Sequence, residues 1–370
     1  LMESAPSTTN WWPVSKLKKP GMLQAASLQA VAHGSDSVLY FQMRQSRGAS
    51  EKFHGAVIDH YGGSDTRVFR EVTKVGAALE KLQEVNGSQN PAEAAVIYDV
   101  ENRWAVEDAA GPRNAGVFYK ETVEKPYQAF RKLGINVDVI DETCSLDGYR
   151  VVAAPMVYLL REGWTEKVRN FVKNGGIFLL TYWSGIVDET DLCYLGGTPH
   201  DLMDVMGFRS MEIDGLYDGE WNEGIPEPEN PLHLELAYRC SHLCELVQPS
   251  TAEVVMTYGK DFYDGMPAMT RNVYGKGKAY AVCTDFGQGL YDEVCRKLAE
   301  EAGVERIVEE VPEGVEVTMR KQKDGTRYVF VQNFNREAVA VKLPIERYPV
   351  WQGTYDGTIG SWKTIVLKGR

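Results

Sequence analysis

The chain begins LMESAPSTTNWW (residues 1–12), a short apolar stub that leads a carboxylate, Glu3, into a loop rich in serine, proline and tryptophan. Parallel (β/α)8 barrels present acidic side chains in this way, at the carboxyl ends of their strands. The opening stretch therefore predicts the end of a barrel strand with Glu3 at the barrel mouth. It also predicts that earlier barrel strands precede residue 1.

Two further segments extend this pattern. The run DSVLYFQM (residues 36–43) is almost continuously apolar, which is typical of a parallel strand buried on both faces. After a long polar loop, apolar residues recur at helical spacing between residues 66 and 82, including Val72, Val75 and Leu79. Two successive strand-loop-helix units are therefore expected, and they fit the last quarter of a barrel over residues 1–88.

The turn-rich connector NGSQNP (residues 86–91) marks a domain boundary. Beyond it, short apolar runs alternate with helical stretches, and these runs occupy residues 94–98, 137–140, 151–155 and 176–180. Such alternation, with glycine at the helix ends, predicts a doubly wound parallel sheet over residues 92–306.

The last segment, residues 310–370, has strand periodicity instead. Apolar residues alternate over 315–319 and 328–331 on either side of a Lys323-Asp324-Gly325 turn, and two later runs at 339–341 and 364–367 read as strands. The pattern predicts a small antiparallel β-sandwich, so the whole chain is expected to be an α/β protein of three domains.

The amino-acid composition limits the kinds of partner that the chain is expected to bind. The formal net charge is −12, which disfavours nucleic acid and anionic membrane surfaces because neither finds a cationic counterpart. No apolar run approaches the ~20 residues that span a bilayer. Six cysteines in 370 residues are too few for a disulfide scaffold and indicate free thiols, so cytoplasm is the expected compartment.

The loop RQSRGASEKFHG (residues 44–55) is densely charged and follows the second predicted strand. Charged loops are often only solvated, and Glu3 has an alternative role as an ion-pair partner of Arg44 or Arg47. Carboxylates together with a tryptophan, however, are what sugar recognition needs, because the ring stacks on C–H faces and the carboxylates accept from hydroxyls. Trp12 is expected to be a core or interface residue.

These motifs resemble glycoside hydrolase family 42, the retaining β-galactosidases. The resemblance rests on residues 1–4 with Asn10-Trp11, on the run FQMRQSRG (residues 41–48) and on EKFH (residues 51–54). It continues through the whole chain, because the central region resembles the family's trimerisation domain, of flavodoxin or glutamine-amidotransferase type, and the tail resembles its small β domain. Where many members have tryptophan after Phe-Gln, this chain has Met43, which lacks a stacking plane.

The resemblance implies hydrolysis of terminal β-D-galactose residues by double displacement. Glu3 would be the nucleophile, Trp11 would line the galactose subsite, and Glu51 and His54 would hydrogen-bond sugar hydroxyls. In the family the second carboxylic acid lies on an earlier barrel strand, so this chain is expected to hold half of the catalytic pair and to be inactive alone. The alternative is a non-catalytic assembly or carbohydrate-binding fragment.

The resemblance also implies a homotrimer, in which Trp183 or Trp221 reaches a neighbour's barrel mouth, unless these rings only fill their own domain. No cofactor is expected. The run Cys240-Ser241-His242-Leu243-Cys244 lacks a fourth metal ligand, so its cysteines are interpreted as buried thiols and no metal is assigned. Residues 181–185 (TYWSG) hold no cysteine, which predicts an amidotransferase-like fold without that chemistry.

Overall fold

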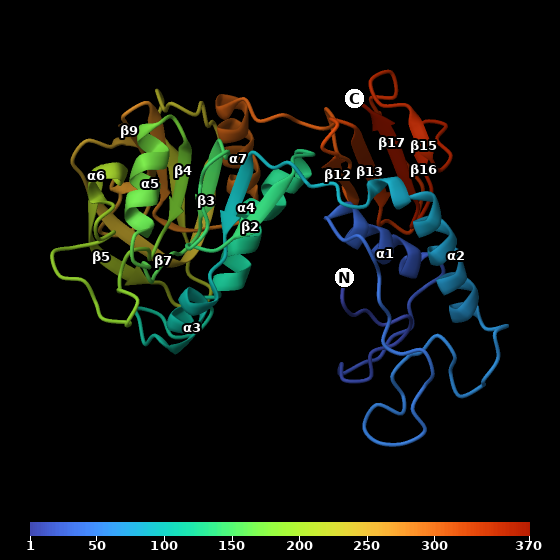
Figure 1. Ribbon diagram of the computed structural model, residues 1–370. Helices are drawn as coiled ribbons and strands as arrows, with labels where there is room; N and C mark the ends of the chain where they lie inside the picture. Colours follow the sequence, from blue (N-terminus) through green and yellow to red (C-terminus); the bar gives the residue numbers. More distant parts are fainter. The chain divides into compact units, whose positions relative to one another are not determined.

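The computed structural model describes residues 1–370 and divides into two compact units (Figure 1). Unit 1 contains residues 1–91, 132–136 and 306–370, and unit 2 contains residues 92–131 and 137–305. The beginning and the end of the chain therefore belong to the same unit. The division into three domains at 1–88, 92–306 and 310–370 stays a prediction.

Unit 2 is built on a mixed sheet of eleven strands. Its parallel half has the order β2-β1-β3-β4-β10, formed by Val137–Ile140, Ala94–Ile97, Val151–Ala154, Ile177–Thr181 and Gly277–Val282. Strands β1, β3 and β4 are buried along their whole length because helices cover both faces of the sheet. The alternation of strands and helices predicted for this region is confirmed.

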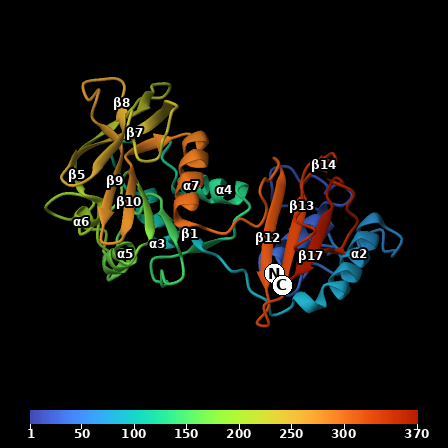
Figure 2. The same ribbon diagram turned by 90° about the horizontal axis from the view of Figure 1, so that it is seen from above.

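The helices of unit 2 divide between the two faces of the sheet (Figure 2). Helices α5 and α6 lie on one face, and α4 and α7 lie on the other. The apolar side of α5, which includes Trp164, Val168 and Val172, packs on the core cluster that contains Phe178 and Leu180 of β4. The helices are α3 (Val100–Asp108), α4 (Tyr119–Lys132), α5 (Trp164–Lys173), α6 (Met203–Met206) and α7 (Gln288–Ala302).

The other half of this sheet is antiparallel, which corrects the prediction of a wholly parallel sheet. It begins where β9 turns into β10 through a tight hairpin that contains Gly275, whose φ of 61° is left-handed. A hairpin can join only antiparallel strands, since a parallel pair needs a long crossover. The additional strands are β5 (Phe208–Gly215), β6 (Asn222–Pro226), β7 (Tyr238–Pro249), β8 (Glu253–Tyr258), β9 (Pro267–Tyr274) and β11 (Thr284–Phe286).

Unit 1 is centred on a four-stranded antiparallel sheet of order β12-β13-β17-β15. One face packs on the strand pair β14-β16, and the other face buries Tyr328, Phe330 and Val366 against helices α1 and α2 (Figure 1). The period-two prediction is thus confirmed, with helices covering the second face. The elements are α1 (Met22–Ala32), α2 (Arg67–Lys81), η1 (Gln83–Val85), β12 (Val315–Lys321), β13 (Arg327–Asn333), β14 (Val339–Ala340), β15 (Val350–Gln352), β16 (Thr358–Ile359) and β17 (Thr364–Gly369).

The two strands expected at the start of the chain do not form. The helix predicted over residues 66–82 is α2, capped by the Thr66 side chain, but residues 36–43 are irregular. They are joined to the opening stub by one parallel bridge between Ser4 and Tyr40. The Leu39 and Phe41 amides donate to the stub, and the Val57 and Ile58 amides donate to the Gln42 and Met43 carbonyls, but these few bonds do not form a continuous ladder.

A buried arginine fastens β12 to the amino-terminal part of unit 1. The Arg320 side chain is fully buried, and its Nη1 donates to the carbonyl oxygens of Val31 and Ser35, each at 2.8 Å. Its Nη2 donates to Asp36 Oδ1 and to the Ser88 carbonyl, also at 2.8 Å. One cation therefore satisfies four acceptors that come from the first 88 residues. None of the helices has the length and apolar character needed to cross a membrane.

Candidate active site

The loop that precedes α1 in the chain contacts the loop that follows it, and this contact brings the predicted site residues together. The amide of Phe41 donates to the Ser4 carbonyl at 3.0 Å, which fixes the residue next to Glu3. The amide of Gly55 donates to the Thr8 carbonyl at 2.9 Å. The Asn10 side chain donates to the Ser50 carbonyl at 2.6 Å, so the position before Trp11 is tied to the position before Glu51.

His54 is the buried centre of this cluster. Its ring stacks on Trp11, with the ring centroids 4.6 Å apart and the planes 13° from parallel, and only 1% of the residue is exposed. Its Nε2 lies 3.2 Å from the Phe41 carbonyl oxygen, which can only accept, so Nε2 carries the proton. In the neutral ring Nδ1 is then an acceptor, and it has no partner.

The remaining predicted residues face solvent. Glu3 is exposed, Glu51 is half-buried, and Trp11 is 57% exposed on the side away from His54. Glu3 makes no ion pair with Arg44 or Arg47, which leaves its carboxylate open to a ligand.

Two residues absent from the sequence-based prediction shape the same loops. A Cβ at Gly55 would lie 2.5 Å from the Thr8 amide nitrogen, so only glycine allows this close approach. Lys18 donates from Nζ to the carbonyl oxygens of Ala5 and Ser7, and burial lowers its pKa. Neither role leaves a sequence signal, because both partners are main-chain atoms.

Two residues near the predicted site, Trp12 and Met43, are exposed to solvent. Trp12 is 62% exposed and so is not a core residue of this chain. Met43 is also exposed.

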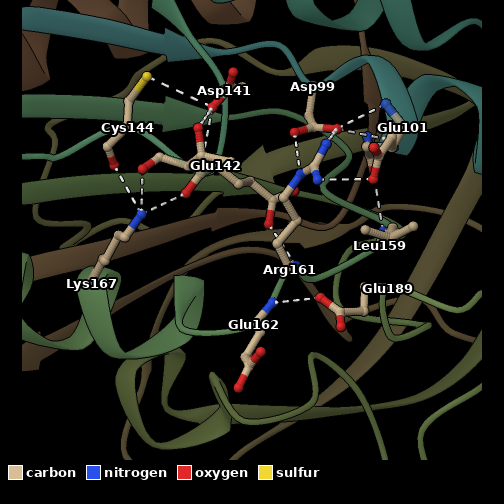
Figure 3. A network of polar contacts seen from close by, with 12 residues as sticks. Asp99, Glu101, Asp141, Glu142, Cys144, Leu159, Arg161, Glu162, Lys167 and Glu189 are labelled. Atoms are coloured by element: carbon tan, nitrogen blue, oxygen red, sulfur yellow. Dashed lines mark hydrogen bonds and ion pairs between the residues drawn. The ribbon is translucent and has the colours of Figure 1, made fainter.

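Unit 2 holds a second cluster of charged groups, at the carboxyl ends of β1, β2 and β3 (Figure 3). Asp99 is fully buried and accepts from Arg161 Nε at 2.7 Å and Nη2 at 3.0 Å. The backbone amide of Arg161 donates to Glu142 Oε2 at 3.0 Å, whereas Glu142 Oε1 has no partner. Parallel sheets bind ligands at this edge, but here Arg161 already neutralises Asp99, so the cluster joins three strand ends.

Glu142→Gln is expected to change how the stability of unit 2 depends on pH. Burial, followed by the nearby Asp99 and Asp141 charges, raises the pKa of Glu142 to about 8, against a usual value of 4.5. Between these values the native state binds a proton that the unfolded chain releases, so Glu142 makes stability fall as pH rises, by up to about 1.4 kcal/mol per pH unit. The uncharged glutamine removes this loss, so thermal melts of the variant gain on the wild type between pH 5 and 8. The exposed Glu162→Gln is the matched control, and parallel curves for Glu142→Gln and wild type would contradict the prediction.

Comparison with known proteins identifies the family of this chain. A family model described as the β-galactosidase trimerisation domain matches residues 92–305, which is more than half of the chain. The chain belongs to glycoside hydrolase family 42. Two further models, described as β-galactosidase and as β-galactosidase C-terminal domain, match residues 1–82 and 314–357.

Family 42 relatives match almost the whole chain. β-Galactosidase BglY of Alicyclobacillus acidocaldarius is 51% identical over 97% of this chain and 52% of its own length. The crystal structure of the β-galactosidase from Rahnella sp. R3 superposes with a TM-score of 0.94 at 48% identity, over 100% of this chain and 54% of that one. A catalytic mutant of Gan42B from G. stearothermophilus, in which a glutamate is replaced by alanine, superposes at 0.93 with 38% identity and covers 100% and 54% of the two chains. The chain thus spans about half the length of these family members.

In this family 42 chain the turn after β4 holds a buried tryptophan. Trp183 occupies the turn with a left-handed φ of 54°, and its amide donates to Glu245 Oε2 at 3.3 Å. Its ring is buried against Tyr158 and Gly111. Trp183 therefore fills its own unit, which corrects the expectation that it reaches a neighbour. Cys193 is exposed in the following loop and is not at the turn.

The interpretation of Cys240 and Cys244 as buried thiols is confirmed. Both lie on β7, both are buried, and both are free. Tyr274 of β9 pairs with Gly277 of β10, so the glycine- and lysine-rich residues 275–278 belong to a hairpin.

Proposed function

We propose that this chain supplies the nucleophile and part of the galactose subsite of a retaining β-galactosidase. The observation that carries the proposal is the stack of Trp11 on the buried His54, which joins the two loops and leaves Trp11 57% exposed. Glu3 and Glu51 lie on the two loops that this stack joins. The family 42 relatives support the substrate class, because they are described as β-galactosidases.

In the proposed reaction, the Glu3 carboxylate attacks the anomeric carbon and the glycosidic oxygen leaves with a proton from a second carboxylic acid. The resulting galactosyl ester of Glu3 is then hydrolysed by water, which the same second residue deprotonates. The two carboxyl groups of a retaining enzyme lie about 5–5.5 Å apart. The second group is proposed to come from the half of the family 42 enzyme that this chain does not match.

Sugar binding is proposed to use the exposed face of the Trp11 ring, on which the apolar face of galactose stacks. The Glu51 carboxylate and His54 Nδ1 accept hydrogen bonds from its hydroxyls.

The function is tested by joining this chain to the part of the Alicyclobacillus β-galactosidase that it does not match. The joined protein is expected to hydrolyse an aryl β-galactoside, and the 370-residue chain alone is expected to be inactive. Turnover by the chain alone would place the second carboxylic acid within residues 1–370. An inactive, folded joined protein would favour a non-catalytic assembly or carbohydrate-binding role.

A homotrimer is proposed for the joined protein, and the trimerisation-domain match supports it. Trp221 remains the candidate to reach a neighbour, because it is 36% exposed; Arg239 and Lys260 both lie over its ring. Trp221→Ala is expected to weaken the trimer in light scattering and to raise KM. Trp183→Ala, a buried control, is expected to lower the melting temperature of unit 2. A monomer, with KM unchanged by Trp221→Ala, would remove unit 2 from both assembly and the site.

A further inference from the structure

One lysine reaches inward from an otherwise exposed segment. Among residues 11–20 every side chain is exposed except that of Lys18, which is half-buried. Its Nζ donates to the Ala5 carbonyl at 2.8 Å and to the Ser7 carbonyl at 2.7 Å. No carboxylate pairs with it, so main-chain oxygens alone compensate its charge.

These two carbonyls belong to the loop that joins Glu3 to Trp11. Gly55 packs against the same loop, because its amide donates to the Thr8 carbonyl and its missing side chain leaves room for the Thr8 backbone. The loop is therefore held at two places, by an ammonium group from residue 18 and by the glycine that follows His54. Pro6 and Ser7 are buried between these contacts.

We propose that Lys18 is a positioning residue, which fixes the Ala5–Ser7 turn and so sets the orientation of Glu3 relative to Trp11. The catalytic part of this inference rests on the proposed function. Hydrogen bonds from a charged donor are about twice as strong as neutral ones, and two of them converge on one turn. Because a misplacement of about 1 Å can cost 10²-fold in rate, release of this turn affects the reaction more than it affects the fold.

The holding contact is tested first in the 370-residue chain, without any activity measurement. Lys18→Met keeps most of the length of the side chain and removes the donor, so hydrogen exchange of the Phe41 and Gly55 amides, which donate to the Ser4 and Thr8 carbonyls, is expected to accelerate about tenfold, with unit 2 unchanged. Lys18→Arg keeps a charged donor and is expected to restore most of the protection. Lys19→Met is the matched control, because its exposed neighbouring ammonium makes no contact with the turn. Unchanged exchange in Lys18→Met would overturn the inference.

The catalytic consequence is tested in the joined protein with the same three variants. Lys18→Met is expected to lower kcat for an aryl β-galactoside by about 10- to 100-fold, with KM changed less than kcat. The rate at which a fluorinated galactoside labels Glu3 falls in parallel, and Lys18→Arg recovers it. Equal kcat in Lys18→Met and wild type would overturn the positioning role. An inactive wild-type joined protein would instead refute the proposed function, and the exchange result would still decide the contact.

Discussion

Glu3→Gln in the joined protein is expected to lower kcat for an aryl β-galactoside by at least about 10³-fold. The amide that replaces the carboxylate is a poor nucleophile, so the galactosyl ester cannot form, while the shape of the side chain is kept. Steady-state kinetics measure the loss. Mass spectrometry after trapping with a fluorinated galactoside is expected to find the wild-type label on Glu3, and a label on any other residue would contradict the assignment.

Glu51→Gln is the matched control for this experiment. Its carboxylate is proposed to accept from sugar hydroxyls, and the amide retains an acceptor oxygen. The variant is therefore expected to raise KM and to keep the labelling of Glu3. Equal losses of kcat in both variants, with no label in either, would show that the two carboxylates do not divide the work as proposed.

Arg320→Met is expected to lower the free energy of unfolding of unit 1 by about 3–5 kcal/mol. The buried guanidinium satisfies three main-chain carbonyls and Asp36, and methionine leaves these carbonyls without donors in an apolar surrounding. Hydrogen exchange of the β13 amides, measured as a function of denaturant concentration, gives the unfolding free energy of unit 1 separately from that of unit 2.

The matched control removes the other end of the same ion pair. The Asp36 side chain is half exposed, and the asparagine of Asp36→Asn keeps an acceptor oxygen for Arg320 Nη2, so the loss is expected to stay below about 1 kcal/mol. A small effect of Arg320→Met would mean that the backbone finds other donors. A large effect of Asp36→Asn would mean that the pair, and not the carbonyls, holds β12 in place.

The parallel half of unit 2 could be predicted from sequence because its strands are buried on both faces. Strands β1, β3 and β4 are uninterrupted apolar runs, and no other common element gives this signal at such a length. The antiparallel half was missed because its strands mix exposed and buried positions. In β5 the register shifts between Ser210 and Glu212, which breaks the alternation that identifies a strand.

The opposite error occurred at residues 36–43. The run DSVLYFQM has the composition of a buried strand, but composition specifies a strand only where partner strands are present. In this structure its neighbours are the short opening stub and residues 57–58, neither of which is a strand, so the segment stays irregular.

For the candidate site, sequence reasoning found the residues with distinctive side chains. Glu3, Trp11, Glu51 and His54 belong to motifs, and the structure places them on loops that contact one another. Lys18 could not be found in this way, because its partners are carbonyl oxygens that every residue possesses. The protonation of Glu142 could not be found either, since it depends on burial at the end of a strand.

The contacts of Arg320 also set an order of events during synthesis. Chains emerge from the ribosome with the amino terminus first, and domains fold as units once they are complete. Unit 2 ends at residue 305, whereas α1 must await β12, which delivers Arg320, and β13, whose Gln332 donates to the Ala25 carbonyl at 3.1 Å. Val366 of β17 then completes the same core. The loops that carry Glu3 are thus made before the strands that support them, so a truncation that removes β17 would act on a site more than 300 residues earlier in the chain.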